Sequence, residues 1–159
     1  MIAFVTDPDE KARVAALILA DLPEWFGIPE STAAYVEGCR RMPFWAAVEA
    51  GEPVGFIALR ETSPYTAEIY VMGVLKARHG QGAGTALWEA FRAYALERGC
   101  EYAQVKTVRR GCYAEYDRTN DFYEHLGFRA LECFPTLWDE ANPCQVYVKY
   151  LKREGEQPD

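Results

Sequence analysis

Histidine, paired cysteines and long apolar runs are scarce in this chain. It has two histidines among 159 residues, and none of its five cysteines lies three positions from another. A metal centre and a disulfide framework are therefore not expected. No window approaches the length of a membrane span, and the N-terminus lacks a charged start followed by an apolar run. We expect a soluble, cytoplasmic protein without a metal.

A basic surface is also missing, because the net charge is -7. This balance disfavours nucleic acid and anionic membranes as partners, and an anionic ligand must be held locally by backbone amides and a few side chains. An acidic surface suits a cationic amine, but it also serves ordinary solubility. The length fits one fold, so we expect a single domain over residues 1–152 and a disordered tail over 153–159.

The most informative segment is the run from His79 to Gly84, which follows an apolar strand and enters a helix. Its glycines alternate at Gly80, Gly82 and Gly84. Such a turn exposes backbone N–H groups at the positive end of the helix dipole, where a pyrophosphate can bind. The spacing fits neither the dinucleotide fingerprint, which needs a glycine at Thr85, nor the P-loop, which needs a lysine there. Glycines that serve only a tight turn are the alternative.

This run resembles the phosphate-binding signature of the GNAT acyltransferases, Gln/Arg-x-x-Gly-x-Gly/Ala, whose loop holds the pyrophosphate of acetyl-CoA. His79 stands where that family usually has arginine or glutamine. The neighbouring Arg78 is a candidate replacement for that phosphate contact.

A second segment, 121–128, is similar to the Phe-Tyr-x-x-x-Gly-Phe motif of the same family, in which a helix carries a tyrosine towards the thioester. Phe122 and Leu126 lie four residues apart on one helical face, and Gly127 suits a left-handed position at the helix end. Upstream, the chain departs from the family pattern, because Tyr116 and Thr119 replace an asparagine and an alanine.

Periodicity and turn residues predict the order of elements along the chain. Asp7 is expected to cap a helix that begins at Pro8. A second helix begins near residue 30, a third runs from the glycine loop to Arg98, and a fourth covers 117–126. Strands are expected at 2–5, 44–49, 54–61, 67–75, 102–108, 128–134 and 145–151. The resemblance implies an α/β GNAT acyl-CoA N-acyltransferase fold, with a mostly antiparallel, splayed sheet flanked by helices.

Acyl transfer to an amine needs an unprotonated amine and a proton for the leaving thiolate. Glu68 lies eleven residues before His79, a position that matches the general-base glutamate of some family members. Its neighbours Ala67 and Ile69 are apolar, so a buried base and a solvated glutamate at a strand edge are both open. The resemblance implies that Tyr123 is the general acid or hydrogen-bond donor to the thiolate, with a packing aromatic as the alternative.

The resemblance also implies which residues meet acetyl-CoA. A strand amide at Gly73 or Val74 would polarise the carbonyl, and a bulge at Gly73 would turn its N–H inward. The loop amides would hold the pyrophosphate. The complete expected donor-binding set is Met72, Gly73, Val74, Arg78, His79, Gly80, Gln81, Gly82, Ala83, Gly84, Thr85 and Tyr123.

In this family the acceptor meets the linker between the first two helices and the loop between the last two strands, which is 135–140 here. Aromatic rings beside carboxylates hold an ammonium group well. The candidates include Tyr113 and Glu115, which are expected in the loop before the Tyr123 helix. Lids or dimer contacts are the alternative roles. The expected acceptor-side set is Trp25, Phe26, Tyr113, Glu115 and Trp138.

The sequence therefore predicts an acetyl-CoA-dependent N-acetyltransferase that acts by direct transfer in a ternary complex on a small-molecule or peptide amine. A ping-pong route through Cys112 stays open, as does a homodimer. The competing hypotheses are a non-enzymatic CoA-binding sensor or interaction module, and a domain that binds another phosphorylated ligand such as a nucleotide.

Overall fold

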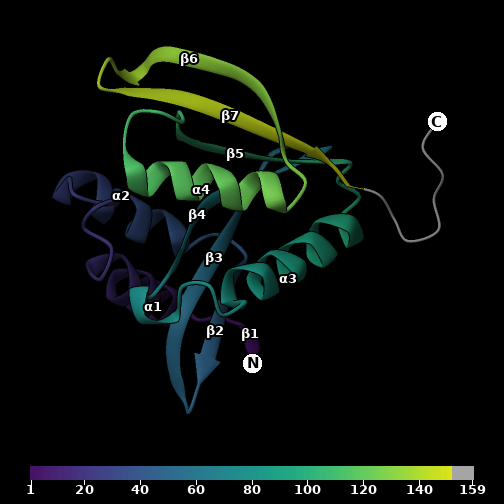
Figure 1. Cartoon of the computed structure of the whole chain (residues 1–159). Coiled ribbons are helices and arrows are strands. Elements are labelled where there is room, and N and C mark those ends of the chain that lie inside the picture. Colours follow the sequence, from purple (N-terminus) through teal and green to yellow (C-terminus); the bar gives the residue numbers. More distant parts are fainter. Residues whose placement is uncertain (152–159) are drawn as a thin grey trace. The chain divides into compact units, whose positions relative to one another are not determined.

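A computed structural model of the chain describes residues 1–151, so the expected tail at 153–159 lies outside the described residues. The strands form a seven-stranded, mostly antiparallel sheet in the order β1-β2-β3-β4-β5-β7-β6, flanked by helices (Figure 1). The residues divide into two compact units. Unit 1 comprises Met1–Arg60 and Ile69–Tyr94, and unit 2 comprises Glu61–Glu68 and the chain from Ala95 onward. The single-domain expectation stays a prediction.

Unit 1 begins with the expected strand and capped helix. Asp7 accepts a hydrogen bond from the Glu10 backbone N at 3.0 Å, and Pro8 is the first helical residue, as predicted. Strands β1, β2 and β3 pair antiparallel in this order. The elements that lie wholly or mainly in unit 1 are β1 (Ile2–Phe4), α1 (Pro8–Ala20), α2 (Pro29–Cys39), β2 (Phe44–Glu49), β3 (Glu52–Ser63), β4 (Thr66–Val74), the 3-10 turn η1 (Lys76–Arg78) and α3 (Ala83–Glu97).

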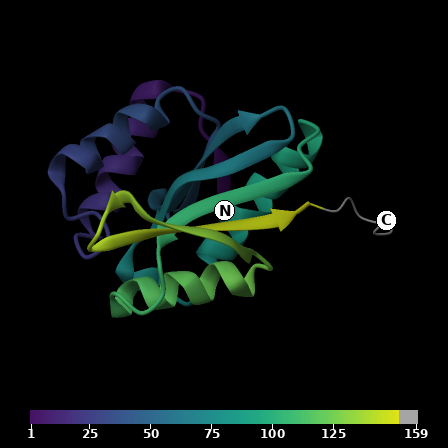
Figure 2. The ribbon, with the colours of Figure 1, turned by 90° about the horizontal axis from the view of Figure 1, so that it is seen from above.

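Successive side chains of β2 point to opposite faces of the sheet and contact two different helical layers of unit 1. Phe44 and Ala46 join a core cluster with α1 and α2, which pack against each other and lie side by side (Figure 2). The intervening Trp45 makes ring contacts with Phe91 and Tyr94 of α3 instead. Because side chains alternate along a strand, one sheet is covered on both faces in this unit.

Unit 2 contains the remaining three strands and one helix. Its elements are β5 (Tyr102–Val108), α4 (Ala114–His125), β6 (Arg129–Asp139) and β7 (Asn142–Tyr150). Strand β7 pairs antiparallel with both β5 and β6. Gly127 follows α4 with φ +97°, which confirms the predicted left-handed residue at the helix end. Within residues 1–151, no helix combines the length and apolar character needed to cross a bilayer.

The prediction of a loop at residues 135–140, between the last two strands, was wrong. Residues 135–139 belong to β6, and only Glu140 and Ala141 turn the chain into β7. Pro135 lies within β6, because a proline is tolerated in an edge strand, where its missing N–H is not required for pairing. The pairing with β7 is irregular between Phe134 and Asp139, next to this proline.

The predicted start of α4 was three residues late, which also corrects the position of Glu115. This residue lies in the first turn of α4, not in the preceding loop. Asp117 had been expected to begin the helix, but its Oδ1 accepts a bond from the Gly111 backbone N at 2.8 Å and fixes that loop. Acidic residues in the first turn also suit the helix dipole. In α2, Cys39 is buried and Tyr35 is half-buried.

Candidate active site

The glycine-rich run of unit 1 forms a turn that leads directly into α3. Gly80 has φ +75° and Gly82 has φ +92°, a backbone region that residues with a Cβ adopt at a cost. The first intrahelical bond runs from the Ala86 N to the Gly82 O at 3.0 Å. The N–H groups before Ala86 in the first turn therefore lack intrahelical acceptors, as at any helix start. The loop presents these amides at the positive end of a helix of 15 residues.

Open space lies beside the same glycines. A Cβ built on Gly80 or Gly82 would meet no atom within 4 Å. Ala83, Gly84 and Thr85 occupy the first turn of α3, and the Thr85 side chain is exposed. The exposed amides and the room beside them suit a pyrophosphate, so these residues fit the phosphate group of CoA.

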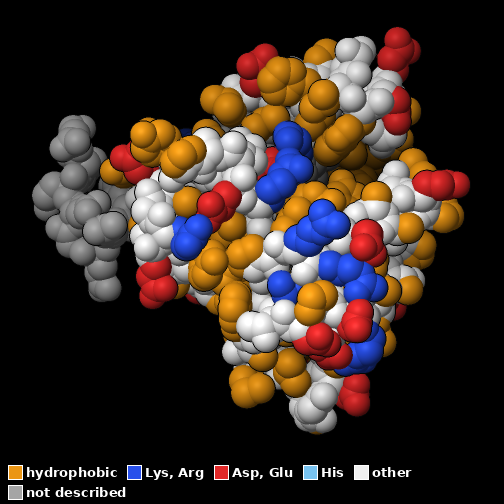
Figure 3. Space-filling view, turned by 180° about the vertical axis from the view of Figure 1, so that it is seen from behind, with side chains coloured by type: hydrophobic (Ala, Val, Ile, Leu, Met, Phe, Trp, Pro, Cys, Tyr) orange, Lys and Arg blue, Asp and Glu red, His pale blue; other side chains and the backbone are white. Residues whose placement is uncertain are grey.

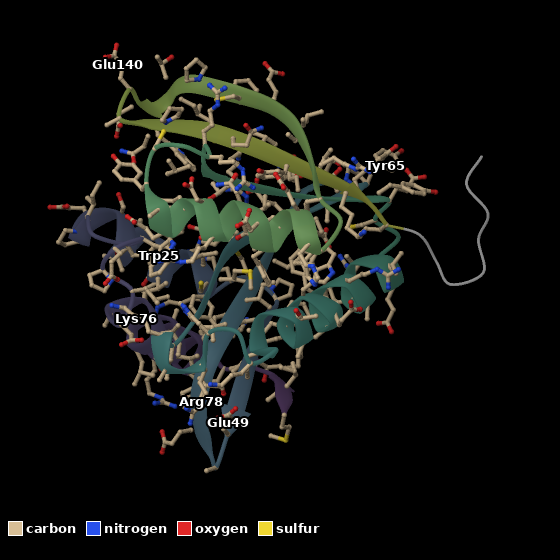
Figure 4. All side chains as sticks on the ribbon, in the orientation of Figure 1. Trp25, Glu49, Tyr65, Lys76, Arg78 and Glu140 are labelled. Atoms are coloured by element: carbon tan, nitrogen blue, oxygen red, sulfur yellow. The ribbon has the colours of Figure 1, made fainter. Side chains whose placement is uncertain are left out.

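The two residues that precede the glycines have partners in unit 1. The Nε of Arg78 lies 2.6 Å from Glu49 Oε2, and Figure 4 shows these two side chains together at the end of the β2–β3 hairpin. The Nε2 of His79 lies 2.7 Å from the Val74 O, and its ring meets the Trp25 ring edge-on at 5.9 Å. Gln81 donates to the Ala77 O at 3.2 Å. The expected phosphate contacts of Arg78 and His79 stay predictions.

The end of β4 is shaped by the approach of α1. A Cβ on Gly73 would lie 2.9 Å from Leu22 Cδ1 and 3.1 Å from Ile18 Cγ2. Gly73 thus has a packing role that is independent of any ligand, because α1 occupies the volume of a side chain there. Met72 and Val74 flank it and are half-buried. A role of the Gly73 or Val74 amide towards a thioester carbonyl stays a prediction.

Glu68 is a buried carboxylate in unit 2, so the alternative of a solvated glutamate was wrong. The residue is 3 % exposed. Its Oε2 accepts a hydrogen bond from Gln104 Nε2 at 2.9 Å and lies 3.1 Å from Lys106 Nζ. Both partners belong to β5, and the Lys106 side chain is partly exposed. A buried carboxylate is costly unless it is paired in this way.

Tyr123 lies on α4 among other aromatic rings of unit 2. It is 6 % exposed, which excludes a solvated surface tyrosine. Its ring centroid lies 5.9 Å from that of Phe128 and 6.3 Å from that of Tyr147. The ring is therefore held by packing, and its role as a proton donor stays a prediction.

A buried polar network next to Tyr123 was missed in the sequence. Asn120 is fully buried, donates to the Val108 O at 2.9 Å and to the Tyr116 O at 2.7 Å, and accepts from the Tyr147 hydroxyl at 2.6 Å. Asn120 thereby ties α4 to the end of β5 and to β7. The available signal was that Tyr116, Asn120 and Tyr123 share one face of a helix.

The network continues to charged side chains nearer the surface. The Tyr147 hydroxyl lies 3.2 Å from Glu124 Oε1, and Arg110 bridges Glu124 and Asp121 at 3.1 and 2.7 Å. Burial, together with the negative charge of Glu124, raises the pKa of Tyr147. The hydroxyl therefore stays protonated at neutral pH and continues to donate to Asn120.

Two of the expected acceptor residues, Trp25 and Phe26, lie in unit 1, in the segment between α1 and α2. Both are half-buried against the core cluster of this unit. Trp25 contacts His79, as described, and Phe26 meets Tyr35 edge-on at 6.0 Å. The structure thus brings one expected acceptor residue against one residue of the phosphate loop.

Two acceptor candidates of unit 2, Tyr113 and Trp138, lie near the turn between β6 and β7. The Tyr113 hydroxyl donates to the Ala141 O at 3.2 Å, so this tyrosine contacts the turn between β6 and β7. Trp138 lies on β6 just before this turn and is 42 % exposed. Cys112, the candidate for a ping-pong route, is exposed beside Tyr113. Exposed hydrophobic side chains are not confined to this region, because Figure 3 shows them interspersed with both charge types on the face that it draws.

Comparison with known proteins identifies the class of this chain. The family model described as the acetyltransferase (GNAT) family matches residues 12–128. The chain therefore belongs to the GNAT acetyltransferase family and is an acyltransferase. The chain has no significant match among curated protein sequences.

Solved structures share the fold at low sequence identity. A GNAT-family acetyltransferase from Desulfovibrio desulfuricans is 18 % identical, with a TM-score of 0.80 over 96 % of this chain and 99 % of that one. The aminoglycoside 6'-N-acetyltransferase from Enterococcus faecium is 22 % identical, with a TM-score of 0.75 over 100 % and 99 %. A GNAT acetyltransferase from Elizabethkingia anophelis with acetyl-CoA bound is 16 % identical, with a TM-score of 0.68 over 95 % and 97 %. These likenesses confirm the predicted fold.

Proposed function

We propose that this protein is an N-acetyltransferase that transfers the acetyl group of acetyl-CoA directly to an amine in a ternary complex. The observation that carries the proposal is the glycine loop of a GNAT family member, with its left-handed Gly80 and Gly82 and the open space beside them. Acetyl-CoA supplies an activated acetyl thioester when it is bound. The Elizabethkingia neighbour holds the same donor.

Residues of unit 1 are assigned to donor binding. The amides of the first turn of α3 bind the pyrophosphate through charge-assisted hydrogen bonds. Because Gly82 carries no side chain, the pyrophosphate can approach these amides. Arg78 is the nearby cation that can add a phosphate contact, and to do so it must leave Glu49.

Residues of unit 2 are assigned to proton transfer. The amine nitrogen attacks the acetyl carbon, the carbon–sulfur bond breaks, and one proton must leave the nitrogen while another reaches the sulfur. Glu68 takes the proton of the amine, directly or through a water, with its carboxylate oriented by Gln104 and Lys106. Tyr123 donates to the leaving thiolate, a hydrogen bond that strengthens as charge develops on sulfur.

The acceptor is an amine whose identity is open. Aminoglycosides belong in the first test, because the Enterococcus neighbour is named for them. Trp25, Trp138 and Tyr113 offer aromatic faces that suit an ammonium group. Amino acids, polyamines and peptides with a free amine complete the panel, since the chain's acidic balance suits any cation.

The test is an acceptor screen that detects the free thiol of released CoA, followed by the Tyr123→Phe variant on any accepted amine. This variant keeps the ring among Phe128 and Tyr147 and removes only the hydroxyl. We expect unchanged acetyl-CoA affinity and a kcat lower by about 10- to 1000-fold. Tyr116→Phe removes the same atom elsewhere on α4 and is the matched control.

Two outcomes would contradict the proposal. A single-turnover rate of Tyr123→Phe equal to that of the wild type would make Tyr123 a packing residue only. Binding of acetyl-CoA without turnover over the whole amine panel would favour the CoA-binding sensor instead of the transferase.

A further inference from the structure

Strand β6 of unit 2 is an outer strand of the sheet and carries a concentration of exposed apolar side chains. Within residues 1–151 it pairs only with β7, so its other edge has no neighbouring strand (Figure 1). Ten of its eleven residues are exposed. Of the twelve large hydrophobic side chains that are exposed among the described residues, four lie on this strand: Leu131, Phe134, Leu137 and Trp138. A long, apolar strand edge of this kind is typical of a contact surface.

The opposite outer strand, β1, is protected differently. It has only three residues, and the ring centroid of its exposed Phe4 lies 5.3 Å from that of Trp45 and 6.0 Å from that of Tyr94. Strand β6 is longer, and it is interrupted by Pro135 and by two irregular stretches in its pairing with β7. Such interruptions hinder the endless addition of strands through backbone hydrogen bonds. A partner of β6 would therefore bind through its side chains.

The side chains of β6 are ordered almost symmetrically about Phe134. Leu131 lies three residues before it and Leu137 three residues after it, while Arg129 lies five residues before it and Asp139 five residues after it. When two antiparallel copies of the strand meet at Phe134, leucine meets leucine, and each arginine lies towards the partner's Asp139. A parallel arrangement would place arginine beside arginine instead. The pattern is thus complementary to itself under a two-fold rotation.

The two ends of β6 carry opposite charge. Arg129 begins the strand, whereas Asp139 ends it and Glu140 follows in the turn, where Figure 4 labels it. Asp139 Oδ1 accepts a hydrogen bond from Asn142 Nδ2 at 2.9 Å, which holds the carboxylate at the turn. A carboxylate has further acceptor capacity, so the same group can also bind a guanidinium. The irregular stretch after Phe134 shortens this half of the strand, a difference that an arginine side chain is long enough to span.

We propose that β6 is a homodimer interface, to which a second copy of this chain binds antiparallel across a two-fold axis near Phe134. The inference does not depend on the proposed acetyl transfer. A two-fold contact uses the same surface on both copies, so the assembly closes at two chains and covers both open edges. Its apolar centre and charged ends match the anatomy of protein interfaces, in which a polar rim surrounds a hydrophobic core.

Sedimentation equilibrium of the full chain tests the interface. For the wild type we expect a monomer–dimer equilibrium with a Kd below about 100 μM. Leu137→Glu places a carboxylate opposite the partner's Leu131, twice in each dimer, and should raise the Kd by at least about 30-fold. Leu17→Glu, at an exposed leucine of α1, is the matched control and should leave the Kd unchanged. Equal urea midpoints for each variant and the wild type verify that folding is intact.

Charge reversal tests the two-fold arrangement. Arg129→Asp and Asp139→Arg each bring like charges together at both ends of the interface, and each should raise the Kd by about 10-fold. The double variant restores opposite charges and should recover the wild-type Kd to within about 3-fold. An effect of Asp139→Arg that came only from losing the Asn142 bond would persist in the double variant, so recovery reports the contact between copies.

Three results would overturn the proposal. A chain that stays monomeric at every concentration has no such interface. A dimer that withstands Leu137→Glu uses another surface. Failure of the double variant to recover rules out the antiparallel arrangement. None of these results bears on acetyl transfer, which the acceptor screen measures separately.

Discussion

The phosphate loop of unit 1 and the Asn120 network of unit 2 hold functional groups in opposite ways. In the loop, the backbone itself positions the N–H groups, because Gly80 and Gly82 adopt positive φ. The neighbouring ion pair is exposed, with 41 % of the Arg78 side chain and 49 % of the Glu49 side chain accessible. In the network, side chains do the positioning, and Asn120 satisfies three hydrogen bonds without contact with water.

The difference predicts how each region responds to substitution. A buried polar group that loses its partners costs far more than an exposed ion pair, because water cannot replace the lost bonds. Unit 2 should therefore lose stability when its polar side chains change. Unit 1 should lose ligand affinity when its loop backbone changes and should tolerate changes to its exposed ion pairs.

The largest effect is expected for Asn120→Ala. It removes the bonds to the Val108 carbonyl and to the Tyr147 hydroxyl, which keeps only its 3.2 Å contact with Glu124 Oε1, so we expect a loss of about 2–4 kcal/mol in the free energy of unfolding. Urea unfolding measures it as a lower midpoint. Arg118→Ala, on an exposed position of the same helix, should change stability by no more than about 0.5 kcal/mol. Equal losses in both variants would show that the network is not stabilising.

Glu68→Gln should have the next largest effect, on turnover. The amide keeps the shape and a hydrogen-bond acceptor but cannot take a proton, so kcat should fall by about 10- to 100-fold near neutral pH. The deficit should shrink towards about pH 10, where more of the amine is already unprotonated. Glu89→Gln, at an exposed position on α3, is the control. A constant ratio of the two rates across pH would argue against a general base at Glu68.

Gly82→Ala should have a moderate effect that separates folding from binding. At φ +92° an added Cβ is strained although nothing obstructs it, so we expect a loss of about 1–2 kcal/mol in stability. Gly51→Ala is the matched control, because Gly51 has φ +81° and equally open space in the β2–β3 turn. Both variants should lose similar stability.

Only Gly82→Ala should weaken CoA binding, by about 10-fold, because its methyl group narrows the approach to the loop amides. Calorimetric titration of both variants with CoA gives the comparison. If the two affinities match that of the wild type, the loop is a tight turn without a phosphate role.

The smallest effect is expected for Glu49→Gln. The exposed pair with Arg78 contributes little, so stability should change by less than about 0.5 kcal/mol. Releasing Arg78 and removing a negative charge should strengthen CoA binding about 2- to 3-fold at low salt, and high salt should erase the gain. Glu52→Gln, also exposed, is the control. A weaker affinity in Glu49→Gln would show that Arg78 does not act on the phosphates.

Local chemistry explains which elements were predictable. Asp7 and Pro8 begin α1 as expected, and Gly127 follows α4 in the left-handed conformation, because capping depends on residues within one turn. The glycine loop was recognisable for the same reason. The end of β6 was not predictable in this way, because a strand can contain Pro135 only where it lies at the sheet edge, which neighbouring residues do not encode.

The candidate site was predictable by residue type but not by partner. Glu68 and Tyr123 stand out through motif and spacing, yet no local pattern indicates that Glu68 meets Lys106 on β5. The Tyr147 partner of Asn120 lies 27 residues away, and the Asp21 partner of Lys76 lies 55 residues away. Such pairs depend on strand register and helix packing, which no local pattern specifies.

The sequence by itself determined the family, the phosphate loop with its helix, and the motif that carries Tyr123. These depend on backbone conformations and residue spacings that are local to a strand–turn–helix or to one helix. Only the tertiary structure decided that Glu68 is buried and paired, that Asn120 anchors α4, and that Trp25 contacts His79. These contacts arise when distant segments pack, because burial then selects the partners that satisfy each polar group.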